Sequence, residues 1–147
     1  MERKKVAQTF LIRVVGFGLF FLASCSSNIA KVSVQDVGEY QLSFYHQGGE
    51  IELWSDFDME FKEPIDVFYQ ISFYQNEELV REILCDPFSV EEKRMTRFVE
   101  LDDLVKVSFL GKMVCSVSLL QGETVSVVSF YAEAEDLEVF RADLILK

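Results

Sequence analysis

Histidine, basic residues and cysteine are all scarce in this chain of 147 residues. It has one histidine, and 14 Lys and Arg residues stand against 25 Asp and Glu residues, which gives a formal net charge of −11. A compact acidic protein repels phosphate backbones, so the composition argues against DNA or RNA as a partner. Three cysteines are too few for a small scaffold held by disulfides. With 50% hydrophobic and 14% aromatic residues, the chain can instead form one domain with its own core.

The single histidine also limits the chemistry that can be expected. His46 lies beside Gly48 and Gly49, where we expect a surface turn. A Ser-His-Asp set cannot be built without it, and the sequence has no glycine-rich phosphate loop and no paired spacing of zinc ligands. A glycosidase needs only two carboxylates, but no pair of acidic residues stands out. The sequence therefore predicts a protein that is not an enzyme and has no catalytic residues and no cofactor.

The N-terminal segment has the composition of an export signal. Four basic residues, Arg3, Lys4, Lys5 and Arg13, precede or flank an uncharged and mostly apolar run at residues 14–22. A membrane-spanning helix needs about 20 such residues, whereas the apolar part of a secretory signal needs about 7–15. The length of the run therefore predicts a signal peptide at residues 1–24.

The residues that follow the run narrow this prediction. Leu22-Ala23-Ser24-Cys25 resembles the lipobox of bacterial lipoproteins, in which an apolar residue and two small residues precede a cysteine. The resemblance implies cleavage before Cys25, lipidation of its sulfur and a lipid bilayer as partner. Each buried CH₂ of an acyl chain contributes about 0.8 kcal/mol, so two or three chains form a firm anchor. An ordinary signal peptide with a chance cysteine is the alternative.

The resemblance also implies a place in the cell envelope. No acidic residue follows Cys25 in Ser26-Ser27-Asn28-Ile29-Ala30. By analogy with other bacterial lipoproteins, this favours the outer membrane over the inner membrane, and its periplasmic face over the cell surface. Residues 25–31 then form a lipidated tether. Residues 25–147 keep 10 of the basic and 24 of the acidic residues, for a net charge of −14.

The rest of the chain alternates between apolar and polar residues. The alternating segments are 51–61, 67–73, 79–85, 105–109, 113–119, 125–134 and 137–146, and turn signals such as Asn76 and Gly122 separate them. The pattern predicts an all-β fold for residues 32–147: an antiparallel β-sandwich, immunoglobulin-like or jelly-roll-like, of about seven to nine strands. A lipocalin-like barrel is the alternative. Residues 88–96 give the least clear pattern, and a short helical turn there is compatible with the sequence. We expect a last strand that buries Phe140, Ala142, Leu144 and Leu146.

Cys85 and Cys115 remain once Cys25 is assigned to lipidation. Both share the alternation parity of the predicted core, and an exported domain meets an oxidising compartment. We therefore expect a disulfide that closes a loop of about 30 residues. The alternative is two buried, reduced cysteines. Trp54 precedes both cysteines instead of lying between them, so any likeness to immunoglobulin domains is limited to architecture.

Two sets of residues on the polar parity could bind a ligand. Trp54, Phe68 and Tyr74 could stack on sugar rings if exposed, although such aromatics often lie under a loop. Asp56, Asp58 and Glu60 are weak candidates for calcium, because successive residues on one strand face are about 6.5–7 Å apart and do not converge on one ion. A solvated acidic face is the preferred interpretation, and no metal is predicted.

These observations predict a non-enzymatic envelope lipoprotein that acts as a binding or structural module for an unknown envelope protein or glycan. The second hypothesis is a carbohydrate-binding module that uses Trp54 and the neighbouring acidic residues, with or without the assistance of calcium. A hydrolase with a carboxylate pair is the third.

Overall fold

A computed structural model describes residues 28–147 of the chain. The predicted signal peptide, the predicted lipidation site Cys25 and the first residues of the predicted tether lie outside this part. Within residues 28–147, no helix is long and apolar enough to cross a membrane.

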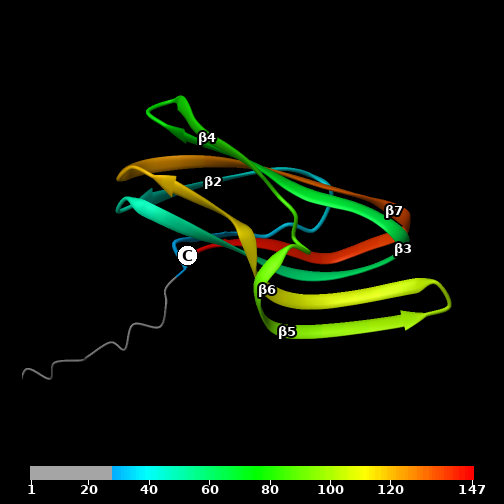
Figure 1. The fold of residues 1–147 in the computed structure, drawn as a ribbon. Coiled ribbons are helices and arrows are strands. Elements are labelled where there is room, and N and C mark those ends of the chain that lie inside the picture. The colour runs from blue at the N-terminus through cyan, green and yellow to red at the C-terminus, as the bar shows by residue number, and fades with distance from the viewer. Residues whose placement is uncertain (1–27) are drawn as a thin grey trace, which may run out of the picture.

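The described residues form seven antiparallel strands, which confirms the all-β prediction. The strands are β1 (Ala30–Val32), β2 (Gly38–His46), β3 (Gly49–Gln75), β4 (Glu78–Cys85), β5 (Val90–Leu101), β6 (Leu104–Leu119) and β7 (Gly122–Leu146). They belong to one continuous sheet in the order β1-β7-β3-β6-β5, with β2 added at β7 and β4 added at β3. This path has two ends, so the sheet is open, and hydrogen bonds do not divide it into two separate sheets (Figure 1).

The two longest strands organise this sheet. β3 and β7 pair with each other along most of their length, and the register of the pair shifts between Asp58 and Asp66. Before the irregular stretch, β3 lies between β6 and the C-terminal half of β7; after it, β3 lies between β4 and the N-terminal half of β7. The segments that we predicted as separate strands on either side of Pro64 are therefore one strand, and the same holds for residues 125–134 and 137–146.

The two halves of the sheet share one hydrophobic core. The Phe57 ring of the first half of β3 meets the rings of Tyr69 and Phe130, at centroid distances of 6.4 and 6.1 Å. The Tyr69 hydroxyl donates a hydrogen bond of 2.7 Å to the carbonyl oxygen of Ala142, and burial raises the pKa of this phenol. All seven strands and this core lie within residues 28–147, so this part of the chain has a hydrophobic core of its own, as an independently folding domain requires.

The alternation predicted for β3 is confirmed. Ile51, Leu53, Phe57, Met59 and Phe61 are buried, and so are Val67, Tyr69, Ile71 and Phe73 after the irregular stretch. The turn predicted at Asn76 is also confirmed, as a hairpin between β3 and β4. Asn76 and Glu77 have φ values of 52° and 67°, the pair of positive values that a tight two-residue hairpin turn requires.

Residues 88–96, where the sequence pattern was least clear, form most of a strand and not a helical turn. β5 begins at Val90 and pairs with β6, but its register shifts between Val90 and Glu92 and again between Lys93 and Met95. Each shift reverses the alternation of side chains, so the period of two is lost from the sequence although the backbone is a strand.

Phe140 also departs from its prediction, because it is 44% exposed. Asp58 pairs with Arg141 and Met59 with Val139, so Phe140 is the extra residue of a β-bulge. Its ring lies on the outer face, with Lys106 Nζ 4.8 Å from the centroid. Ala142, Leu144 and Leu146 are buried as predicted.

A disulfide joins Cys85 of β4 to Cys115 of β6, as the sequence predicted, with 5.7 Å between the Cα atoms. β4 and β6 do not pair through hydrogen bonds, so the bridge links strands from the two halves of the sheet. It closes a loop across 30 residues of sequence that contains all of β5.

We predict that the Cys85→Ala/Cys115→Ala variant of residues 28–147 loses roughly 3–4 kcal/mol of unfolding free energy, because the unfolded chain gains the entropy of the opened loop. Urea denaturation of both proteins measures this difference. Wild-type protein reduced before denaturation is the control, and it should match the variant. Two alkylated thiols in unreduced protein would contradict the bridge.

Candidate functional site

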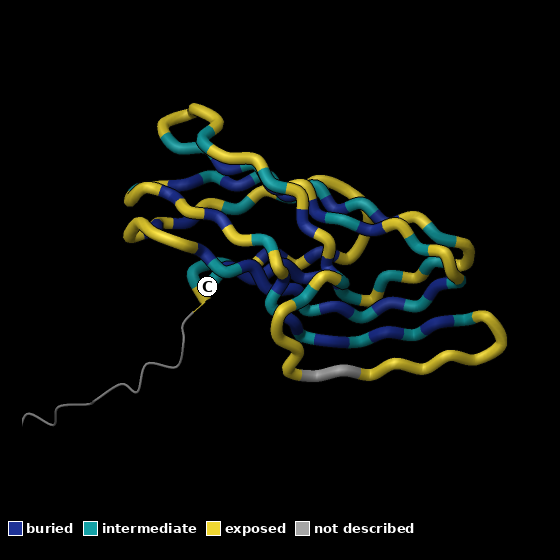
Figure 2. The backbone as a smooth tube through the Cα atoms, in the orientation of Figure 1, coloured by how far each residue is buried: buried dark blue, intermediate teal, exposed yellow. Residues whose placement is uncertain are grey.

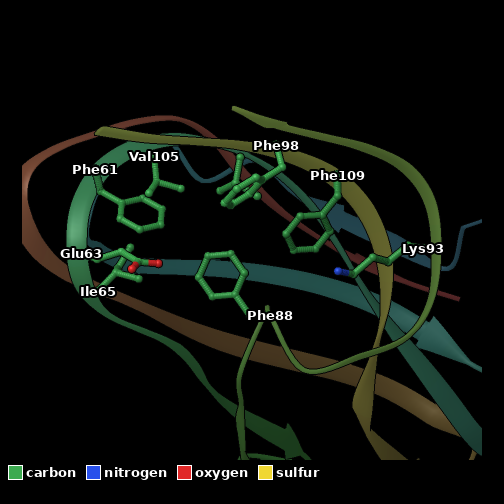
Figure 3. A pocket seen from close by; sticks show the side chains of 9 residues that line it. Phe61, Glu63, Ile65, Phe88, Lys93, Phe98, Val105 and Phe109 are labelled. Atoms are coloured by element: carbon green, nitrogen blue, oxygen red, sulfur yellow. The ribbon is translucent and has the colours of Figure 1, made fainter. Parts of the chain in front are cut away.

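An apolar cleft of about 390 Å³ lies between the β5–β6 hairpin and the irregular stretch of β3. Its lining is mostly aromatic and aliphatic, with one acidic and one basic residue: Phe61, Glu63, Ile65, Phe88, Lys93, Phe98, Val105, Val107 and Phe109. Figure 3 shows Phe61, Val105, Phe98 and Phe109 along one wall, with the Phe88 ring facing them. The volume falls within the range of about 300–1,000 Å³ that is typical of small-ligand sites.

The cleft opens beside β5, which is an edge strand of the sheet. In the described residues β5 pairs with β6 alone, and Figure 2 shows that most of β5 is exposed. Phe98 of β5 lies opposite Val107 of β6, so the two side chains share the inner face. Val107 is buried, whereas Phe98 is 59% exposed. An aromatic side chain on the inner face therefore stays accessible to a ligand.

Phe88 forms the opposite side of the cleft and is held in place by local contacts. Its ring lies 5.7 Å from that of Phe57 and 5.9 Å from that of Phe109, between centroids. Its backbone N–H donates to Asp86 Oδ1 over 2.8 Å, and the next N–H, of Ser89, donates to the Asp86 carbonyl. Cys85 immediately precedes this turn, so the disulfide fixes the segment that carries Phe88.

The two charged residues of the cleft lie at opposite ends. In Figure 3 Glu63 and Lys93 are on opposite sides of the Phe88 ring. Lys93 Nζ is 5.6 Å from the centroid of Phe109, a distance at which a cation is attracted to a ring. The charged ends can therefore orient a ligand whose own polar groups flank the apolar group that fills the cleft.

A second, acidic hollow of about 330 Å³ adjoins the cleft at the Glu63 end. Glu63 and Val105 line both, and the remaining lining residues are Lys62, Glu100, Asp103 and Glu135. Lys62, the only cation among them, forms an ion pair of 2.6 Å with Asp136, and this hydrogen bond raises the pKa of the lysine. This end of the cleft is therefore strongly negative.

The three aromatic residues predicted as a stacking platform do not come together. Phe68 stacks on Tyr131 with 4.9 Å between centroids, and Tyr74 lies six residues further along β3. Six residues of strand span about 20 Å, and Trp54 lies in the other half of the sheet. No single groove can use all three rings.

Trp54 is also not exposed, contrary to the prediction of a stacking platform. The ring lies on the outer face but is only 1% accessible, because Arg94 Cζ and Lys147 Nζ lie 4.4 and 4.0 Å from its centroid. Its Nε1–H donates to Glu52 Oε2 over 3.1 Å. Hydrogen bonds from Lys112 and Trp54 lower the pKa of Glu52, which keeps this carboxylate ionised. Cationic side chains thus cover the ring that a sugar would need.

Asp56, Asp58 and Glu60 alternate along the outer face of β3 and do not converge. Asp56 binds Arg141 Nε over 2.9 Å, and Glu60 binds Lys106 Nζ over 3.4 Å. Asp58 Oδ1 is buried and accepts no hydrogen bond. Across residues 28–147, no group of three or more His, Cys, Asp or Glu side chains is placed to hold a metal ion.

His46 lies at the turn between β2 and β3 but is buried, not at the surface as expected. Its Nε2 is 3.3 Å from the carbonyl oxygen of Gly49. Gly48 and Gly49 have φ values of 93° and 112°, a conformation that L-residues rarely adopt, and it turns the chain back over the ring.

Sequence reasoning assigned the β3 and β6 residues of the cleft to the core and missed the cleft itself. Phe88 and Phe98 flank a mostly charged and polar segment at residues 89–97, in which the apolar residues Val90 and Met95 show no period of two because of the two register shifts in β5. The one available signal was a lone phenylalanine within a charged strand.

Comparison with known proteins adds no relative. No model of a protein family matches the chain, and no curated protein matches it significantly. The functional argument therefore depends on the geometry of the cleft.

We predict that Arg94→Ala shifts the fluorescence of Trp54 to longer wavelength and increases its quenching by acrylamide, because one cover of the ring is removed. Trp54 is the only tryptophan, so the signal is unambiguous. Stability should fall by no more than about 1 kcal/mol, the size of a surface cation–π contact. Arg97→Ala, on the same strand, is the control and should leave the emission unchanged. Equal spectra for both variants would contradict the covering role of Arg94.

Proposed function

We propose that this chain is a non-enzymatic binding module of the bacterial cell envelope, and that it holds an apolar group of its ligand in the cleft between β3 and the β5–β6 hairpin. The observation that carries the proposal is the cleft itself: an accessible, mostly apolar hollow of about 390 Å³ with charged residues only at its ends. Exposed apolar patches rimmed by polar residues are typical of interaction sites.

The lining supports binding over catalysis. Glu63 and Lys93 lie at opposite ends, and the remaining lining residues are apolar. A nucleophile or a general base needs a polar partner within hydrogen-bond reach, at about 2.6–3.2 Å. The lining offers aromatic contact area and orientation by charge, which are the requirements for recognition.

We propose that the two halves of the bent sheet form the two layers of a β-sandwich, and that the cleft lies at an open end between these layers. Support comes from the core contacts between the two halves of β3 and β7 and from the disulfide across them. The immunoglobulin-like or jelly-roll-like description remains part of this proposal.

The location in the envelope is proposed from residues 1–25. Leu22-Ala23-Ser24-Cys25 resembles a lipobox, so the chain would be anchored through acylated Cys25, with the periplasmic face of the outer membrane favoured. The Cys85–Cys115 disulfide supports export, because such bridges persist in oxidising compartments.

We predict that residues 28–147 bind the neutral aromatic dye N-phenyl-1-naphthylamine, and that Val107→Trp weakens this binding by roughly tenfold, because the larger side chain fills the cleft. Dye fluorescence in a titration measures the affinity.

Val114→Trp is the matched control, since Val114 lies on the same strand but is exposed and does not line the cleft. It should bind the dye like the wild type. Thermal unfolding verifies that both variants fold. Equal affinity of a folded Val107→Trp variant would remove the cleft as the binding site.

We predict that Cys25→Ala in the full chain prevents both lipidation and cleavage. Labelled fatty acid in growing cells and the mass of the purified protein measure the two steps. Cys85→Ala is the control, because it removes a cysteine outside the lipobox and should leave the acyl label in place. Normal processing of the Cys25→Ala variant would contradict the lipobox.

A further inference from the structure

We propose that the cleft and the free edge of β5 together bind an extended basic segment of another protein, which adds to the sheet as a strand beside β5. One apolar side chain of the segment enters the cleft, and its Lys or Arg residues meet the acidic rim. This inference rests on the proposed function, because it names the class of ligand that the same cleft takes.

The backbone of β5 offers the first part of this site. β5 has 12 residues and pairs only with β6 in the described chain, so the N–H and C=O groups on its other side have no neighbouring strand. Residues 96–101 pair with β6 in regular register, whereas both bulges lie between residues 90 and 95. A regular free edge is a template for strand addition, whereas a bulged edge is not.

The side chains of β5 offer the second part. Phe98, on the inner face, is 59% exposed, whereas Val99 and Leu101 are exposed on the outer face of the same strand. A strand added at the usual spacing of about 4.8 Å continues the inner row formed by Val107 and Phe98. Its inward side chain then covers the exposed ring of Phe98 and reaches the mouth of the cleft. Glu100 lies two residues from Phe98 and pairs with the buried Val105, so it belongs to the same inner row. Because alternate side chains of a strand point to one face, the segment needs an apolar residue beside Phe98 and a Lys or Arg two positions further, beside Glu100.

Charge decides what kind of segment fits. Glu63, Glu100 and Asp103 are exposed at the rim, and none of them takes part in an ion pair within residues 28–147. By contrast, Asp56 and Glu60 on the outer face of β3 each contact a cationic side chain. The rim carboxylates are therefore free to bind Lys or Arg of a partner.

The same charge disfavours a second copy of this chain as the occupant. The described part carries 10 basic and 24 acidic residues, so two copies joined at β5 would bring two acidic rims close together. Lys93, at the far end of the cleft, sets the direction: the basic residues of the segment belong at the Glu63 end.

The test uses a labelled peptide of about nine residues whose inward, alternate positions carry Phe and Val toward one end and Lys toward the other, with Thr at the outward positions. It is titrated with residues 28–147 and followed by fluorescence anisotropy. We expect saturable binding that weakens with increasing salt, as screening of exposed charges requires. Glu63→Lys/Glu100→Lys and Val107→Trp should each weaken it by about tenfold or more. The controls Glu39→Lys/Glu78→Lys, with the same change of charge on other strands, and Val114→Trp should bind like the wild type.

Two N-methylated peptides test strand addition separately from side-chain contact. Methyl groups on one alternating set of amides point toward β5 and should abolish binding, whereas methyl groups on the other set point away and should leave it intact. Equal binding of both peptides would overturn strand addition. Equal binding of a peptide with Glu in place of Lys would overturn the role of the rim.

Other occupants are distinguishable in the same series. Concentration-dependent dimers of residues 28–147 that the peptide does not dissociate would assign β5 to a second copy and overturn the inference. Tighter binding of a peptide of residues 1–24 would assign the cleft to the chain's own basic segment and would also overturn it. If the dye binds the cleft but no basic peptide does, the inference fails and the proposed function stands; if the dye also fails, both fail.

Discussion

Continuous pairing between β3 and β7 is the constraint on which the rest of the structure depends. Each of these strands is far longer than the usual five or six residues, and a long twisted ribbon buries its apolar face only if it bends back on itself. The irregular register between Asp58 and Asp66 allows that bend. Each half of the ribbon then recruits its own neighbours, β6 and β5 on one side and β4 on the other, and the core forms where Phe57 meets Tyr69 and Phe130.

We attribute the cleft to a difference in the number of strands that join each half of β3. β5 and β6 add two strands to the first half of β3, but β4 alone adds to the second half, so the inner face of the hairpin lacks full cover. Phe88 supplies part of the cover from the link between β4 and β5, and the disulfide at Cys85 fixes that link. The feature that ties the halves together thus also shapes the site. An exposed aromatic ring on an inner face does not contribute the free energy that its burial would provide, so the stability of the domain alone does not explain the exposure of Phe98.

The sequence predicted those parts of the fold that one strand decides alone. The alternation along β3 and the hairpin at Asn76 and Glu77 depend on local residues, and the parity of Cys85 and Cys115 followed from the same alternation. The predictions that failed concern side chains whose direction or cover is set by another strand. Phe140 is pushed outward by a bulge defined against β3, and β5 lost its period through two shifts against β6. Trp54 is covered by Arg94 and Lys147, which are 40 and 93 positions away in the chain. The cleft was not predictable for the same reason, because its lining comes from four segments that only the topology brings together.

The distribution of charge separates the outer face of the sheet from the rim of the cleft. On the outer face, cations and acids alternate across neighbouring strands: Lys112 contacts Glu52, Arg141 contacts Asp56 and Lys106 contacts Glu60. Cross-strand pairs of opposite charge stabilise a sheet, so these acidic residues have a structural role. Glu100 and Asp103 at the tip of the β5–β6 hairpin form no such ion pair in the described part of the chain, and Lys62, the cation that lines the same hollow, is paired with Asp136. Acidic residues without an ion pair beside an open apolar cleft are suited to a basic partner, whereas the paired acidic residues of the outer face already stabilise the domain.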